Sequence, residues 1–160
     1  MTRRASVPSV RRRHRLRLAA GALLALLAGG CATEQAGVPV ECKSGRAALR
    51  AALERAPRPV RVEGRPLSQC FTTASNSADI AEVGEEYLAV ASGLAEDARA
   101  EPEGAAALRL GYLVGAVRRG AAATQGTNDE MLRRVEQELT LVNARTPAFR
   151  RGERAGRAEG

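Results

Sequence analysis

Residues 79–100 read DIAEVGEEYLAVASGLAEDARA, and this stretch decides the fold. Its large apolar side chains recur at alternating spacings of three and four residues, which places them along one stripe of an α-helix. The stripe consists of Ile80, Val83, Tyr87, Val90 and Leu94. Asp79 and Glu82 favour the positive end of this helix, and Pro102 limits its other end to about Ala100. The sequence therefore predicts one long amphipathic helix with a packing seam.

Two further segments show the same helical spacing. Residues 44–56 place alanines and leucines on one face and end before Pro57, so a short helix is expected there. Residues 104–119 predict another helix, within which Gly111 and Gly115 lie about one turn apart. Two glycines at this spacing let a neighbouring backbone approach closely, so we expect close intramolecular packing on that face.

The C-terminal region predicts one more helix and then a tail. Thr127 and Glu130 form a T-x-x-E capping box, and apolar residues at helical spacing continue to Val142. Pro147 is expected to close this helix. Residues 150–160, RRGERAGRAEG, contain no apolar residue larger than alanine, so they are expected to be a disordered tail.

Residues 60–70, VRVEGRPLSQC, are expected to form a loop. Val60 and Val62 have the spacing of a brief strand, but a single strand without a partner is not stable. The patterns together predict an all-α fold class, in the form of a small bundle of three or four helices.

The N-terminal region has the pattern of a secretory signal peptide. Residues 2–17 carry seven arginines and no acid, and residues 18–30, LAAGALLALLAGG, form an uncharged run of 13 residues. At about 1.5 Å per residue this run spans about 20 Å as a helix, which is short of a hydrocarbon core of about 30 Å. A basic segment followed by a short apolar run that ends in small residues is typical of an export signal.

Residues 27–31, LAGGC, resemble the lipobox of bacterial lipoproteins, with Ala28 at the position usually held by leucine. The resemblance covers only the leader and the cleavage site. It implies cleavage between Gly30 and Cys31, a diacylglycerol on the Cys31 thiol and an acyl group on the freed amine. Because Ala32 follows in place of aspartate, it also implies the outer membrane in a cell with two membranes, and otherwise the outer face of the cell membrane. An ordinary secreted protein and an uncleaved membrane anchor are the alternatives.

With Cys31 assigned to lipid, Cys42 and Cys70 remain as an even pair in an exported chain. Such a pair predicts a structural disulfide in an oxidising compartment. A redox or metal pair is the alternative, but the spacing is not CxxC. The chain then divides into four parts, which are a signal peptide at 1–30, a lipidated cysteine with its tether at 31–42, a helical domain at 43–149 and a disordered tail at 150–160.

The net charge of +7 belongs to the leader. Seven of the 25 cations lie in the first 30 residues, so 18 cations face 18 acids in the remainder. Nucleic-acid binding needs a cluster of cations that displaces counterions, and no such excess of positive charge remains once the leader is removed. We therefore expect no nucleic-acid partner. The only histidine, His14, is lost with the leader, and with it any imidazole metal site or catalytic triad.

Glu82, Glu85 and Glu86 form the densest cluster of carboxylates. Two of them could share one helix face, as a metal ligand set or an acid/base pair requires, but a solvated helix face is the preferred interpretation. Residues 43–65 hold seven cations and two acids, whereas residues 79–103 hold eight acids and one arginine. We therefore expect these glutamates to face some of the arginines of the first segment, namely Arg46, Arg50, Arg55, Arg58 and Arg61.

These observations predict a membrane-anchored envelope lipoprotein with a structural or protein-interaction role. Its expected partners are the lipid bilayer, through acyl chains on Cys31, and a further protein of the envelope. No cofactor, metal ion or enzymatic activity is expected. Two alternatives stay open. A small-ligand-binding helical module at the cell surface or in the periplasm would need an apolar pocket beside Glu82 or Glu85, and a carboxylate-dependent enzyme would need two coupled glutamates in a cleft.

Overall fold

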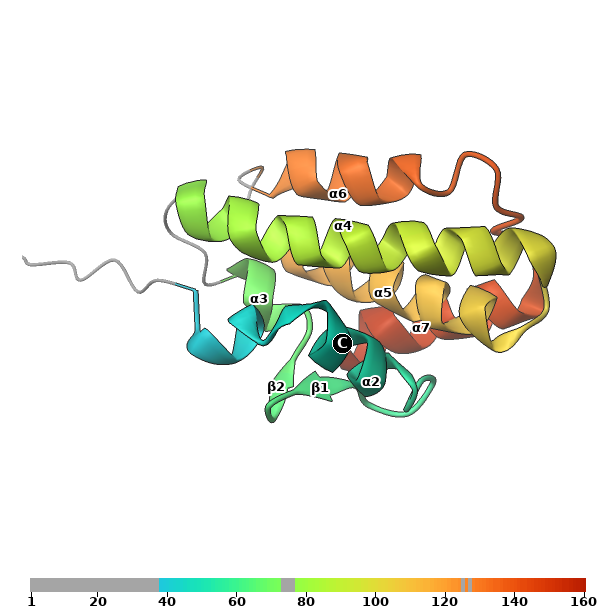
Figure 1. Cartoon of the computed structure of the whole chain (residues 1–160), viewed down its shortest axis with the longest axis horizontal. Coiled ribbons are helices and arrows are strands. Elements are labelled where there is room, and N and C mark those ends of the chain that lie inside the picture. Colours follow the sequence, from blue (N-terminus) through green and yellow to red (C-terminus); the bar gives the residue numbers. More distant parts are fainter. Residues whose placement is uncertain (1–37, 73–76, 125, 127) are drawn as a thin grey trace, which may run out of the picture. The chain divides into compact units, whose positions relative to one another are not determined.

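Helices make up most of the residues that the computed structural model describes, which are 38–72, 77–124, 126 and 128–160. In chain order the elements are η2 (Val40–Lys43, a 3-10 helix), α2 (Gly45–Leu53), β1 (Arg61–Val62), β2 (Arg65–Pro66), α3 (Gln69–Thr72), α4 (Ser77–Ala100), α5 (Ala105–Ala122), α6 (Asp129–Gln137) and α7 (Pro147–Glu159) (Figure 1). The all-α class is confirmed. The described residues form six α-helices, however, so the expected number of three or four was too low.

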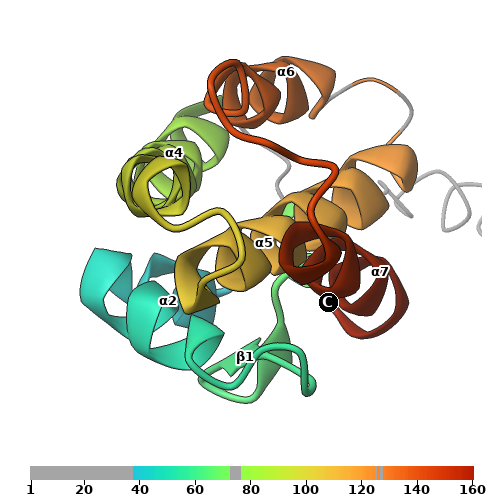
Figure 2. The ribbon, with the colours of Figure 1, turned by 90° about the vertical axis from the view of Figure 1, so that its right-hand side faces the viewer.

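Helix α5 lies at the centre of the described residues, between α4 and α7 (Figure 2). Six of its residues are completely buried, namely Leu110, Tyr112, Leu113, Val114, Ala116 and Val117. Helix α4 packs on α5 through four members of the predicted stripe, all of them buried, namely Val83, Tyr87, Val90 and Leu94. The helical spacing therefore identified the face of α4 that packs into the core.

The segment expected to be a loop forms a small hairpin instead. Strands β1 and β2 pair antiparallel, with Arg61 opposite Pro66 and Val62 opposite Arg65. The turn between them has positive φ angles at both central residues, 47° at Glu63 and 84° at Gly64. Such a two-residue turn matches the twist of paired strands, and it gives the first strand the partner that the sequence did not reveal.

The C-terminal segment is not a disordered tail but helix α7. Thr146 is its N-cap and accepts a hydrogen bond from the Phe149 backbone N–H at 3.2 Å. Pro147 therefore opens this helix rather than closing the preceding one, as suits a residue with no N–H to donate. The prediction failed because it looked for large apolar side chains, whereas α7 packs mainly through glycines.

The contact between α5 and α7 is made by backbone against backbone. A Cβ atom on Gly111 would overlap the carbonyl oxygen of Phe149, and one on Gly156 would overlap the carbonyl oxygen of Tyr112. Gly115 and Gly152 lie equally close to the opposite helix. The contacts advance in the same direction along both helices, so α5 and α7 are parallel. The expectation of close intramolecular packing at Gly111 and Gly115 is thus confirmed.

Helix α6 is shorter than expected and begins differently. It ends at Gln137, so the predicted continuation to Val142 is made of turns. Asn128 occupies the N-cap position without a capping hydrogen bond from its side chain, which instead donates to the carbonyl oxygen of Phe71. The predicted capping box is therefore wrong. Thr127 lies outside the described residues, and Glu130 binds Arg133 and Arg134 instead.

Candidate functional site

Cys42 and Cys70 form the predicted disulfide, with 5.5 Å between their Cα atoms. Both cysteines are buried in the core, and the bond joins η2 to α3. It leaves Cys31 as the third cysteine of the chain. Gly30 and Cys31 lie outside the described residues, so the predicted cleavage and lipidation site is a sequence prediction only.

The start of the described chain is tied to the first turn of α4 through Asp79. The Val38 backbone N–H donates to Oδ2 of Asp79 at 3.1 Å, and Lys43 Nζ lies 2.7 Å from Oδ1 of the same carboxylate. Lys43 Nζ also lies 2.9 Å from Oε2 of Glu82. Hydrogen bonds to Asp79 and then to Glu82 raise the pKa of Lys43, so this lysine keeps its charge under ordinary conditions.

The three glutamates of the predicted cluster have separate surroundings. Glu86 Oε2 lies 3.3 Å from Nε of Arg46, as the complementary charges of the two segments predicted. Glu82 is paired with Lys43, which the prediction did not include, and Glu85 is exposed. Within the described residues, no group of three histidine, cysteine, aspartate or glutamate side chains is arranged to hold a metal ion. The cluster therefore acts, through two of its members, as a salt-bridge surface.

These ion pairs join α2 and its preceding turn to α4, which is the packing that the charge segregation predicted. Helix α2 contributes Leu49 and Leu53 to the same interface, where both are nearly fully buried. The apolar residues supply most of the stabilisation, because an exposed ion pair contributes about 1 kcal/mol or less. Arg46 and Lys43 thus fix how the two elements align rather than hold them together.

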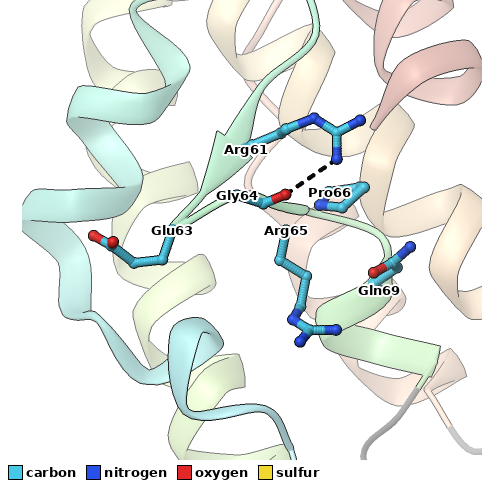
Figure 3. Close-up of a pocket in the computed structure, with 6 residues that line it drawn as sticks. All are labelled: Arg61, Glu63, Gly64, Arg65, Pro66 and Gln69. Carbon is cyan, nitrogen blue, oxygen red and sulfur yellow. Dashed lines mark hydrogen bonds between the residues drawn. The ribbon is translucent and has the colours of Figure 1, made fainter.

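A shallow hollow of about 330 Å³ lies on the hairpin (Figure 3). It is lined by Arg61, Glu63, Gly64, Arg65, Pro66 and Gln69. The Arg61 guanidinium donates to the carbonyl oxygen of Gly64 at 3.1 Å, and Arg65 Nε lies 3.5 Å from Oε2 of Glu41. Figure 3 shows the Glu63 carboxylate directed away from both guanidinium groups. The hollow is thus polar, open and lined by two cations, unlike the enclosed apolar pockets that hold most small ligands.

Two more hollows lie elsewhere on the described residues. One of about 340 Å³ adjoins the hairpin hollow, with which it shares Arg61, Pro66 and Gln69, and it extends to Arg119 and the end of α7. A smaller one, of about 130 Å³, lies where α2, α4 and α5 meet and is lined in part by Leu53 and Leu94. None of the three hollows is lined by Glu82, Glu85 or Glu86, so the pocket that the ligand-binding alternative required is not among them.

Two buried tyrosines hold the hairpin segment on the core. The Val60 N–H donates to the Tyr112 hydroxyl oxygen at 2.9 Å, and the Tyr87 hydroxyl donates to the carbonyl oxygen of Leu67 at 3.4 Å. Burial raises the pKa of both hydroxyls, which stay neutral at ordinary pH. These two contacts cannot be read from the sequence, because the spacing of a tyrosine identifies a core position but not the distant backbone group that its hydroxyl meets.

An arginine that sequence analysis did not single out joins the last three helices. Arg118 of α5 binds Glu136 of α6, with 2.7 Å between the Arg118 Nε and Glu136 Oε1 atoms, and it also binds Glu153 of α7. Arg119 donates to the carbonyl oxygens of Arg157 and Ala158 at the end of α7. The available signal was the pair of arginines at the end of a helix, but it did not indicate which partners they have.

Comparison with known proteins found no matching protein family, no matching curated protein and no matching solved structure. None of the helices within the described ranges is both long enough and apolar enough to cross a bilayer.

Proposed function

We propose that this chain is an exported lipoprotein of the cell envelope, held to a bilayer through Cys31 and serving a structural or protein-interaction role. The proposal is carried by the pairing of Cys42 with Cys70. Structural disulfides belong to oxidising compartments, which agrees with an export signal at the start of the sequence. The pairing also leaves Cys31 available for lipid.

The length of chain between the anchor and the folded residues fits a short tether. Val38, whose backbone N–H is bound by Asp79, lies seven positions after Cys31. A fully extended chain of this length spans at most about 25 Å. An acylated Cys31 would therefore keep the helices close to the membrane surface and present them to other components of the envelope.

An interaction role is favoured over catalysis by what the charged residues do. Glu82 and Glu86 are each engaged by a cation, and the hollow on the hairpin is polar and open. The helices carry charged outer faces over a core that contains a disulfide, and charge complementarity of this kind can steer a surface towards a partner.

Mass spectrometry of the protein isolated from membranes tests the anchor. The expected product begins at Cys31 and carries the mass of a diacylglycerol and a further acyl group. A Cys31→Ala variant should lose this mass and appear uncleaved at Gly30. A wild-type product that retains Met1, or that has an unmodified Cys31, would overturn the proposal.

Cross-linking in intact cells, followed by purification, tests the interaction role. The same envelope proteins should be captured repeatedly by the wild-type chain and lost from a variant in which Cys42 and Cys70 are both alanine, if the folded helices make the contact. Capture that is unchanged in the variant would show that the folded domain is not what the partner recognises. Capture of no protein would contradict the interaction role.

A further inference from the structure

Helix α7 has two faces of different chemistry. One face carries Gly152 and Gly156, which lie against the backbone of α5. The opposite face carries four exposed arginines, namely Arg150, Arg151, Arg154 and Arg157. At about 100° per residue these four positions fall within about one third of the helix circumference. The helix therefore presents a continuous stripe of positive charge.

Most of this positive charge is not neutralised by neighbouring acids. Glu153 binds Arg157, with 3.2 Å between the nearest atoms, and it also binds Arg118. Among the ion pairs that the described residues form, none includes Arg150, Arg151 or Arg154. These three residues are defined here as the arginine face of α7.

The arginine face is held in a fixed position. Gly152 and Gly156 lock α7 against α5, and Thr146 caps its first turn. At the other end, the Ser68 hydroxyl donates to the carbonyl oxygen of Gly160 at 2.5 Å. A rigid array of guanidinium groups loses less entropy when it binds than one carried on a mobile segment.

The molecule carries the opposite charge on the other side of α5. Helix α4 contains six acids and one arginine, whereas α7 contains four arginines and two acids. Figure 2 shows α5 between these two helices. Three of the α4 acids, Asp79, Glu82 and Glu86, are paired with Lys43 or Arg46, whereas the arginine face forms no ion pair among the described residues. A negatively charged planar surface nearby would therefore attract the side with α7 most strongly.

We propose that the arginine face of α7 binds the phosphate groups of anionic phospholipids in the bilayer to which the chain is attached. This inference rests on the proposed acylation of Cys31, because the tether then keeps Val38, where the described chain begins, within about 25 Å of the membrane. Guanidinium groups form paired, charge-assisted hydrogen bonds with phosphate oxygens. The attraction extends over only about 10 Å at ordinary ionic strength, so a cationic face needs such a tether to stay within range.

The test measures how fast each arginine is modified by phenylglyoxal when the lipidated chain is placed in vesicles. One set of vesicles contains only phosphatidylcholine, and the other contains phosphatidylcholine mixed with phosphatidylglycerol. Mass spectrometry of peptides should show several-fold slower modification of Arg150, Arg151 and Arg154 on the anionic vesicles. Concentrated salt should remove this protection. Two control arginines, Arg55 in the turn after α2 and Arg99 on α4, are also exposed and should react equally on both kinds of vesicle.

A pair of matched variants distinguishes lipid binding by the arginine face from nonspecific electrostatic binding of the protein to the vesicles. Arg150→Gln with Arg154→Gln should abolish the protection of Arg151 on anionic vesicles, whereas Arg55→Gln with Arg99→Gln should leave it unchanged. Both variants alter exposed side chains and remove the same charge, and circular dichroism confirms that they fold. Equal protection of Arg55 and Arg99, or protection of the arginine face on both kinds of vesicle, would overturn the proposal.

The intact mass of the same sample distinguishes a failure of the proposed lipid anchor from a failure of the proposed lipid binding by the arginine face. If Cys31 carries no lipid, the proposed function fails, and the unmodified chain is then sedimented with the two kinds of vesicle. Salt-sensitive sedimentation with the vesicles that contain phosphatidylglycerol would still support lipid binding by the arginine face, provided that the double variant Arg150→Gln with Arg154→Gln sediments less. No sedimentation with either kind of vesicle would overturn it.

Discussion

Gly152 lies so close to Leu108 that a Cβ atom on this glycine would overlap the carbonyl oxygen of Leu108 and lie 2.8 Å from the backbone nitrogen of Tyr112. A Gly152→Ala substitution must therefore push α7 away from α5. Overpacking of this kind costs about 1–3 kcal/mol, and more where only rigid backbone stands in the way. Urea denaturation should show this loss in the free energy of unfolding.

Gly93 provides the matched control for this substitution. It also lies inside a helix, but a Cβ atom there would meet only the flexible guanidinium end of Arg50, which can move away. Gly93→Ala should be neutral or raise the free energy of unfolding by up to about 1 kcal/mol, because alanine favours helix more than glycine does. Equal losses in the two variants would contradict the proposed backbone contact.

Tyr112 and Tyr87 provide a second matched pair. The Tyr112 hydroxyl is the acceptor for the buried Val60 N–H at 2.9 Å, so Tyr112→Phe leaves that donor without a partner. The expected loss is about 1–3 kcal/mol in the free energy of unfolding. Tyr87→Phe removes a longer hydrogen bond, of 3.4 Å to the Leu67 carbonyl oxygen, and should cost under about 1 kcal/mol. A larger loss at Tyr87 than at Tyr112 would contradict this ranking.

The spacing of large apolar residues predicted α4 well, and it failed on α7 for a physical reason. In α4 the contact surface is made of side chains such as Val90, whose recurrence is visible in the sequence. In α7 the contact surface is the backbone at Gly152 and Gly156, where what matters is the absence of a side chain. The useful signal was the shared spacing of four residues between these glycines and between Gly111 and Gly115.

The sequence predicted contacts in the candidate site that follow from residue type, but it did not predict which individual residues of those types meet. An even pair of cysteines predicted the disulfide, and opposite charges predicted the contact of Arg46 with Glu86. Charge counts did not identify Lys43 as the partner of Glu82, because they do not say which cation the chain brings to that turn. Contacts between distant segments, such as Arg118 with Glu153, depend on a topology that no local pattern contains.

The disulfide should contribute substantially to stability. Cys42 and Cys70 are separated by 28 residues, and closing a loop of this length stabilises the folded state by about 3–4 kcal/mol in the chain-entropy model. The double variant Cys42→Ala with Cys70→Ala should lose about this much free energy of unfolding. Wild-type protein in a reducing agent should match it. An unfolding midpoint in urea that does not respond to either treatment would contradict the structural role of the bond.

Glu130 should report on acid denaturation at the start of α6. Hydrogen bonds from Arg133 and Arg134 lower the pKa of this carboxyl from 4.5 to about 2. Because the folded pKa is the lower one, the contribution of Glu130 to stability is present above pH 4.5 and is lost as the pH falls through about 2. A carboxyl titration by NMR should place its midpoint near 2. Arg133→Gln should raise that midpoint, and an unchanged value would show that Arg133 is not the main cause.

The pairing of Arg46 with Glu86 can be separated from the other contacts of α2 by exchanging the two charges. Arg46→Glu alone and Glu86→Arg alone each replace this ion pair, whose nearest atoms lie 3.3 Å apart, with two like charges, so each should lower the melting temperature at low salt. The combined variant restores an opposite pair and should recover most of the loss, although the interaction amounts to about 1 kcal/mol or less. Arg55→Glu, at an exposed site that makes no ion pair among the described residues, is the control for net charge. If the combined variant is destabilised by the sum of the two single losses, the two residues do not interact, and α2 is aligned with α4 by its apolar contacts and by the ion pairs of Lys43.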